Sequence, residues 1–170
     1  RATVIGVTGT AGKTSVKEAL ASVLSGAGVT EKNPLNLNNQ IGLPLSMLNA
    51  SENAAYWVME AGISTPHDMD ELGPVLHPDL AILLNAGAGH TEFLGDRGVA
   101  HYKSRLLDHL AEGGKTLVCA DYPDLLSEAN NRAVPCITFS GISNAADYTA
   151  IPAAVTEGAV DVMARRGPFA

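Results

Sequence analysis

Short apolar runs alternate with helix-like segments over most of this chain, and this alternation limits the possible folds more than any other feature. The expected strands are Thr3–Thr8, Tyr56–Met59, Asp79–Asn85, Thr116–Ala120 and Val134–Phe139. Continuous apolar strands separated by helices are typical of parallel sheets that are covered on both faces. The sequence therefore predicts an α/β fold with a mostly parallel sheet and helices on both faces.

The helices are predicted from apolar residues spaced three and four apart. The first carries such a face at Val16, Ala19, Leu20, Val23 and Leu24 and ends before Gly26 and Gly28. A later face comprises Val99, Tyr102, Leu106, Leu107 and Leu110. Further helices are expected over Ile41–Asn49, over His67–Val75 with Pro74 and Pro78 closing it, and over Pro123–Asn131. The Asn-rich stretch Lys32–Gln40 is expected to be a loop, and the chain after Tyr148 to be either a hairpin or the start of a missing part.

Composition narrows the class of protein. A length of 170 residues suggests one domain, and a net charge of -7 without a basic run argues against a nucleic-acid partner. The apolar runs are too short to span a membrane, and no signal-peptide pattern is present. Cys119 and Cys136 are expected to be buried, reduced thiols, which favours a cytoplasmic location. Arg1 leads within two residues into the apolar run Val4–Val7, which leaves no room for a start segment, and the other end has no closing element, so we expect a fragment of a longer protein.

The stretch from Thr8 to Ser15, TGTAGKTS, follows an expected strand and opens an expected helix. In that context glycines let backbone N–H groups surround phosphate oxygens, and the helix N-terminus adds positive charge. Lys13 would reach the outer phosphates, and the Thr14 hydroxyl would bind Mg²⁺. The usual upstream glycine is replaced by Val7, which we place inside the strand, with the turn starting at Gly9. The alternative is a simple glycine turn with a solvated lysine.

Polar residues at the ends of two further strands are candidates for the same site, because ligands of such folds bind beyond the carboxyl ends of the strands. Glu60 closes a strand and offers a carboxylate to a hard cation, or else is a surface glutamate. The small residues of Asn85–His90 permit close approach to a ligand and expose His90, which could equally be structural.

Two more features have functional and structural interpretations. Lys103 lies at the polar edge of the helix that begins near Arg97, where most lysines are solvated. The amides of Asn36, Asn38 and Asn39 could orient a substrate or simply form turns.

Taken together, these strings resemble the central ATP-binding domain of the Mur ligases. The loop Thr8–Ser15 is similar to the family's TGTxGKT[ST] pattern, which lacks the upstream glycine. The similarity continues in order through Val58–Gly62, Asn85–His90 and Tyr102–Ser104. Thr14–Glu18 and Asn36–Pro44 most resemble the member that adds D-alanyl-D-alanine. The chain departs from the family string after Glu60, where it reads Ile63–Ser64.

The resemblance implies an ATP-dependent ligase of peptidoglycan precursor synthesis. A carboxylate of UDP-N-acetylmuramoyl-peptide would be activated as an acyl phosphate and then joined to D-alanyl-D-alanine, with ATP and Mg²⁺ as cofactors. The implied nucleotide-binding residues are Gly9, Thr10, Ala11, Gly12, Lys13, Thr14 and Ser15. The implied catalytic residues are Lys13, His90 and Lys103, and the metal site would use Thr14, Glu60, His90 and a carbamate on Lys103.

Residues 1–150 would form the central domain in part, and 151–170 the start of a missing subregion. Two other interpretations stay open. One is another Mur-like ligase of the folylpolyglutamate or cyanophycin synthetase type, and the other is a phosphate-loop module that binds a nucleotide without ligase chemistry.

Overall fold

The structure is a computed structural model that describes residues 1–87, 97–156 and 159–166, with side chains described outside 151–165. In chain order its elements are β1 (Thr3–Thr8), α1 (Lys13–Leu24), β2 (Thr30–Lys32), α2 (Gly42–Leu48), β3 (Tyr56–Glu60), α3 (Asp68–Leu76), β4 (Leu80–Leu83), α4 (Gly98–Ser104), the 3-10 helix η1 (Arg105–His109), β5 (Lys115–Cys119), α5 (Pro123–Asn131), β6 (Cys136–Ser140), β7 (Tyr148–Thr156) and β8 (Ala159–Arg166).

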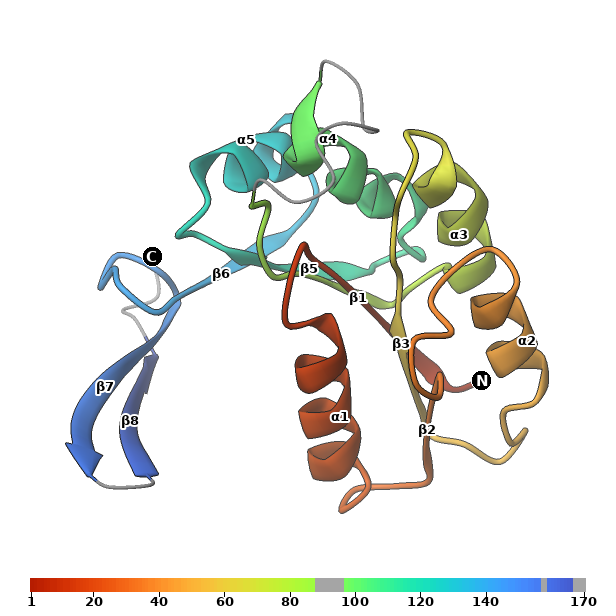
Figure 1. The fold of residues 1–170 in the computed structure, drawn as a ribbon, viewed down its shortest axis with the longest axis horizontal. Coiled ribbons are helices and arrows are strands. Elements are labelled where there is room, and N and C mark those ends of the chain that lie inside the picture. The colour runs from red at the N-terminus through yellow and green to blue at the C-terminus, as the bar shows by residue number, and fades with distance from the viewer. Residues whose placement is uncertain (88–96, 157–158, 167–170) are drawn as a thin grey trace.

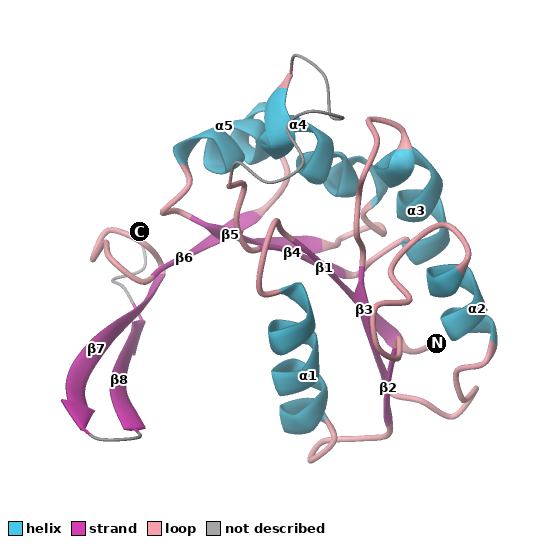
Figure 2. Ribbon diagram, in the orientation of Figure 1, coloured by secondary structure: helices cyan, strands magenta, loops and turns pink. Residues whose placement is uncertain are grey.

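One sheet runs through the described chain in the order β2-β3-β1-β4-β5-β6-β7-β8 (Figure 2). Every neighbouring pair is parallel except β7 and β8, which form an antiparallel hairpin. The prediction of a mostly parallel α/β sheet is therefore confirmed.

Helices cover both faces of the sheet (Figure 1). On one face, α1 packs on a cluster that contains Ile5, Val7, Val58 and Ile82. On the other face, a larger cluster joins the sheet to α2, α3, α4, η1 and α5. Successive residues of β1 serve opposite faces, since Val4 belongs to the larger cluster and Ile5 to the smaller. Burial on both sides explains why the strands are continuously apolar.

The strand order brings the candidate residues together. β1 lies between β3 and β4, and Val7 pairs with Glu60 on one side and Ile82 on the other. The loop after β1, the end of β3 and the loop after β4 therefore meet at the edge formed by the carboxyl ends of these strands, as the sequence predicted.

The predicted apolar face of α1 is confirmed in part, since Val16, Leu20 and Leu24 pack against the sheet. Val23 is 75% exposed and Ala19 is exposed, whereas Lys17 and Ala21 are buried. Lys17 is buried because it finds polar partners inside the protein, a possibility that a search for apolar spacing misses.

Three local expectations need correction. Pro74 does not close α3, which runs to Leu76. The proline is exposed and removes only one backbone N–H, and the next helical hydrogen bond runs from the His77 N–H to the Gly73 carbonyl. The strand Thr30–Lys32 was not predicted, since a polar edge strand of three residues has no apolar pattern. The helix from Gly98 tightens into a 3-10 turn that buries the adjacent Leu106 and Leu107.

The region after Tyr148 forms the hairpin that was one of the two expectations, and β7 extends the sheet beside β6. The division at residue 150 stays a prediction. Cys119 is buried and Cys136 half-buried, both are free thiols, and burial raises the pKa of each. Across the described ranges, no helix is long and apolar enough to cross a membrane.

Candidate functional site

The loop between β1 and α1 is shaped by its two glycines. Gly12 has a φ of +79°, in the left-handed region that favours glycine. A side chain on Gly9 would begin 3.0 Å from Cβ of Leu84 and 3.3 Å from Oδ1 of Asn85, so glycine allows this close approach. Val7 is fully buried within β1, which confirms that the turn starts at Gly9 and needs no glycine further upstream.

Asn85, just after β4, binds this loop across 74 residues of sequence. Its side-chain amide accepts from the Ala11 N–H and donates to the Ala11 carbonyl, both at 2.9 Å. Its backbone carbonyl accepts from the Thr10 N–H at 3.2 Å, and the Thr10 hydroxyl donates to the Gly87 carbonyl at 3.3 Å. The segment after β4 therefore sets the shape of the loop, a role that the sequence did not reveal.

Two lysine ammonium groups meet at one carbonyl of the loop. Lys13 Nζ donates to the Gly9 carbonyl at 2.9 Å, and Lys103 Nζ donates to the same oxygen at 3.0 Å. Lys103 is only 4% exposed, so its interpretation as a solvated helix lysine is wrong. Burial, followed by repulsion from Lys13, lowers the pKa of Lys103 from 10.5 to about 8. Two cations that share a neutral acceptor are arranged to attract an anion such as a phosphate.

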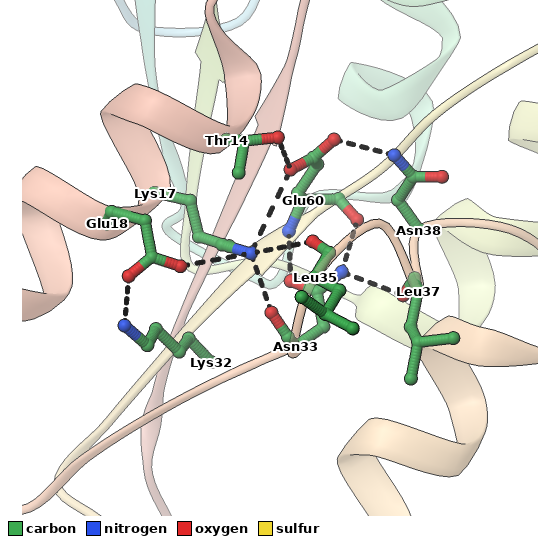
Figure 3. Close-up of polar contacts among 9 residues, drawn as sticks. All are labelled: Thr14, Lys17, Glu18, Lys32, Asn33, Leu35, Leu37, Asn38 and Glu60. Atoms are coloured by element: carbon green, nitrogen blue, oxygen red, sulfur yellow. Dashed lines mark hydrogen bonds and ion pairs between the residues drawn. The ribbon is translucent and has the colours of Figure 1, made fainter.

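Glu60 ends β3 as a buried carboxylate, 2% exposed, facing the start of α1. Its Oε2 accepts from the Thr14 hydroxyl at 2.8 Å, and its Oε1 accepts from the Asn38 amide at 2.6 Å (Figure 3). The interpretation of Glu60 as a surface glutamate is therefore wrong.

The Thr14–Glu60 pair fits a magnesium ion by donor type and spacing. Both side chains offer hard oxygen atoms, which Mg²⁺ prefers. Adjacent ligands of an octahedral Mg²⁺ with bonds of about 2.1 Å lie about 3 Å apart. The 2.8 Å separation of the two oxygens is close to that value. His90, the third predicted metal ligand, lies outside the described residues.

A polar cavity of about 500 Å³ opens beside the loop. Its lining comes from the loop, the Asn-rich segment, the turn after β3 and Lys103: Thr10, Lys13, Asn38, Asn39, Gln40, Gly62, Ile63, Ser64, Thr65, Asp68 and Lys103. At Gly62 an added Cβ would lie 2.9 Å from the Asn38 side chain, so this glycine lets Asn38 approach. A phosphate held by the loop would therefore face a hydrogen-bonding wall.

Asp68 organises the far wall of the cavity. Its carboxylate accepts from the backbone N–H groups of Ser64 and Thr65 and from the Gln40 amide. Burial alone would raise its pKa, but the hydrogen bonds from Thr65, Ser64 and Gln40 hold the pKa of Asp68 below its ordinary value. The carboxylate thus fixes the shape of this wall, a role that no local sequence pattern indicates.

The three asparagines predicted to bind substrate occupy different environments. Asn38 and Asn39 line the cavity, whereas Asn36 is exposed and is not part of its lining. Asn39 Oδ1 also accepts from the N–H groups of Ile41 and Gly42 at the start of α2. Asn39 therefore both stabilises the turn before α2 and lines the cavity.

Lys17 and Asn33 were not predicted as site residues. Lys17 is fully buried and contacts the Asn-rich segment, and Asn33 pairs with the backbone of Glu60. The position of Lys17 next to the apolar Val16 was the available signal, but it does not indicate which groups the lysine contacts.

We expect the stability of the protein to rise from about pH 8 to pH 10.5 relative to a Lys103→Met variant. In that window the unfolded chain binds more protons at residue 103 than the folded chain, because the folded pKa is about 8. The destabilisation is complete below pH 8 and is relieved by pH 10.5. The full shift corresponds to about 3 kcal/mol. Urea unfolding of both proteins in CO₂-free buffer measures the difference, and a difference that does not change with pH would contradict the prediction.

The fold and the site define an α/β domain of the phosphate-binding-loop type. Residues 7–165 match a family model described as the Mur ligase middle domain. This chain belongs to the Mur ligase family.

Its similarity to one branch of the family is seen in sequence and in structure. It is 39% identical over 121 residues to the UDP-N-acetylmuramoyl-tripeptide–D-alanyl-D-alanine ligase of Bacillus subtilis, covering 71% of this chain and 26% of the relative. Among solved structures, MurF of Thermotoga maritima in complex with ADP matches with a TM-score of 0.87 and 32% identity, over 96% of this chain and 38% of that one. MurF of Acinetobacter baumannii matches with a TM-score of 0.88 and 27% identity, over 98% and 36%. The chain thus spans well under half the length of these proteins.

Proposed function

We propose that the protein containing this chain is an ATP-dependent ligase of peptidoglycan precursor synthesis in the cytoplasm. It would join a carboxylate of UDP-N-acetylmuramoyl-peptide to the amine of D-alanyl-D-alanine, and this chain would bind ATP and Mg²⁺. The similarity to the UDP-N-acetylmuramoyl-tripeptide–D-alanyl-D-alanine ligase of Bacillus subtilis supports these two substrates. The observation that carries the proposal is the buried Glu60 carboxylate, 2.8 Å from the Thr14 hydroxyl beside a loop that holds two lysines.

The chain's own residues would bind the outer phosphates. The helix N-terminus and the amides of the loop favour phosphate oxygens. Lys13 would exchange its contact with the neutral Gly9 carbonyl for a phosphate oxygen, so that both partners of the hydrogen bond carry charge. Thr14 and Glu60 would hold Mg²⁺, which supplies further positive charge beside the phosphates. By resemblance to the family, His90 would be a further ligand of Mg²⁺.

The chemistry requires this concentration of positive charge. The substrate carboxylate attacks the γ-phosphorus atom, ADP leaves with the electron pair of the broken bond, and an acyl phosphate forms. The dipeptide amine then attacks the acyl carbon, inorganic phosphate leaves and the amine loses a proton. Lys13 faces the space where the negative groups converge, and a carbamate on Lys103 would help Thr14 and Glu60 to hold the Mg²⁺ that adds positive charge there. Stabilisation of developing charge is the main contribution available to such a site.

The cavity beside the loop is the proposed route by which the carboxylate of UDP-N-acetylmuramoyl-peptide reaches the γ-phosphate. Asn38 and Asn39 line it and offer amide groups for orientation. Asn36 is exposed outside it, so its proposed contact requires a substrate that extends over the Asn-rich segment.

An assay of the full-length protein tests the proposal. We expect phosphate release that requires ATP, the UDP-linked peptide and D-alanyl-D-alanine together, with a product whose mass corresponds to one new amide bond. Turnover only with another acid and amino acid would instead support a folylpolyglutamate or cyanophycin type of ligase. Nucleotide binding without turnover on any acid would support a binding module.

Residues 1–170 alone are expected to form no amide bond. The chain covers only 26% of the ligase of Bacillus subtilis, so we expect most substrate contacts to be made by parts of the full-length protein outside residues 1–170. Holding two reactants in near-attack geometry contributes about 7–11 kcal/mol in well-oriented systems. Phosphate release from this chain that depends on both substrates would refute the prediction.

A further inference from the structure

Lys17 is a fully buried lysine that the proposed phosphate chemistry does not use. It lies on α1 three residues after Thr14, so both side chains emerge from one face of the helix. Its side chain is 0% exposed. A buried ammonium group requires polar partners inside the protein, and their identity shows what the lysine holds in place.

The partners of Lys17 lie mainly in the segment 33–38, called here the Asn segment. The Nζ atom donates to the carbonyl of Asn33 at 2.7 Å and to that of Leu35 at 3.1 Å (Figure 3). The carboxylates of Glu18 and Glu60 lie farther away, at 3.4 and 4.0 Å. The close contacts of Lys17 are thus with backbone, and the Glu60 oxygen is beyond hydrogen-bonding distance.

The Asn segment in turn holds both the backbone and the side chain of Glu60. The side chain of Asn33 accepts from the Glu60 N–H at 2.8 Å and donates to the Glu60 carbonyl at 3.0 Å. The amide of Asn38 donates to Glu60 Oε1 at 2.6 Å. A chain of direct contacts therefore leads from Lys17 through the Asn segment to the carboxylate beside Thr14.

We propose that Lys17 is a positioning residue that holds the Asn segment and thereby orients Glu60 toward Thr14 and the cation bound with the nucleotide. The part that concerns the cation rests on the proposed function, whereas the contacts belong to the chain itself. A purely electrostatic role would have the opposite sign, because removing a positive charge near Glu60 would strengthen its attraction for a cation.

The Lys17→Met variant of the full-length protein tests this inference with two measurements. The first is amide hydrogen exchange at Glu60, whose N–H is bonded to the Asn33 side chain. The second is the affinity for Mn²⁺, used as a paramagnetic substitute for Mg²⁺, in the presence of ADP. We expect Glu60 exchange to be at least about tenfold faster and the Mn²⁺ affinity to be at least about tenfold weaker, because two charge-assisted hydrogen bonds are lost.

Lys32→Met is the matched control. Lys32 also pairs with Glu18, but its side chain is 41% exposed. It should leave Glu60 exchange and Mn²⁺ affinity unchanged within about twofold, as expected for an exposed ion pair. Equal or tighter Mn²⁺ binding by Lys17→Met, or unchanged exchange at Glu60, would overturn the positioning role.

The two proposals can fail separately. Wild-type protein that binds neither ADP nor Mn²⁺ would refute the proposed function, and faster Glu60 exchange in Lys17→Met would still support the link from Lys17 to Glu60. If Lys17→Met does not fold, ¹⁵N-lysine NMR of the wild-type protein decides. The Lys17 ammonium protons should exchange slowly, and rapid exchange like that of Lys32 would overturn the inference. In protein that binds ADP and Mg²⁺ these protons should also shift on binding, and no shift there would overturn it too.

Discussion

Replacing Lys13 by Ala should weaken ATP binding by roughly 10- to 150-fold, since a charge-assisted hydrogen bond contributes about 1.5–3 kcal/mol. Lys13 emerges at the first position of α1 and reaches back to the Gly9 carbonyl at 2.9 Å. The ammonium group is therefore already beside the loop that would cradle the phosphates. Calorimetric titration of the full-length protein with ATP and Mg²⁺ measures the change.

Lys115→Ala provides the control for net charge. Lys115 is an exposed residue at the beginning of β5, away from the carboxyl edge where the loop lies. It should leave ATP affinity within about twofold of wild type, because a distant exposed charge is screened by salt. Equal affinity in wild type and Lys13→Ala would show that the loop does not use this lysine for phosphate.

Replacing Lys103 by Ala should lower the ligase activity by about 100-fold or more, which is the usual loss when one preorganised electrostatic group is removed from an active site. The resemblance to the family implies that Lys103 reacts with CO₂ to form a carbamate, a reaction that attaches CO₂ to a neutral amine and releases a proton. The pKa of about 8 supports this proposal. About a quarter of such an amine is neutral at pH 7.5, against about 0.1% for a lysine with a pKa near 10.4.

Three further measurements separate the carbamate from a plain cation. Lys103→Arg keeps the positive charge but should also be inactive, because a guanidinium group remains protonated. Acetate should restore part of the activity of Lys103→Ala by entering the vacated space, whereas bicarbonate should not. Wild-type protein in ¹³C-bicarbonate should show a carbamate carbon signal that Lys103→Ala lacks. Full activity of Lys103→Arg without added acid would leave Lys103 as a cation only.

The sequence by itself determined the sheet and the edge at which the site lies. Apolar runs such as Thr3–Thr8 indicate strands buried on both faces, and the loop Gly9–Thr14 must then follow a strand and open a helix. The position of Glu60 at a strand end follows from the same local pattern. These features could be predicted because each depends on residues that are neighbours in the chain.

Tertiary structure alone decided which side chains meet at that edge. Lys103 binds the Gly9 carbonyl across 94 residues, and Asn85 binds Ala11 across 74. Lys17 is buried because two carbonyls of the Asn segment surround its ammonium group. Hydrophobic periodicity reports which face of an element leaves water, but it carries no information about a polar partner on a distant segment. The burial of Lys17 and the lowered pKa of Lys103 therefore became visible only when the strands were placed side by side.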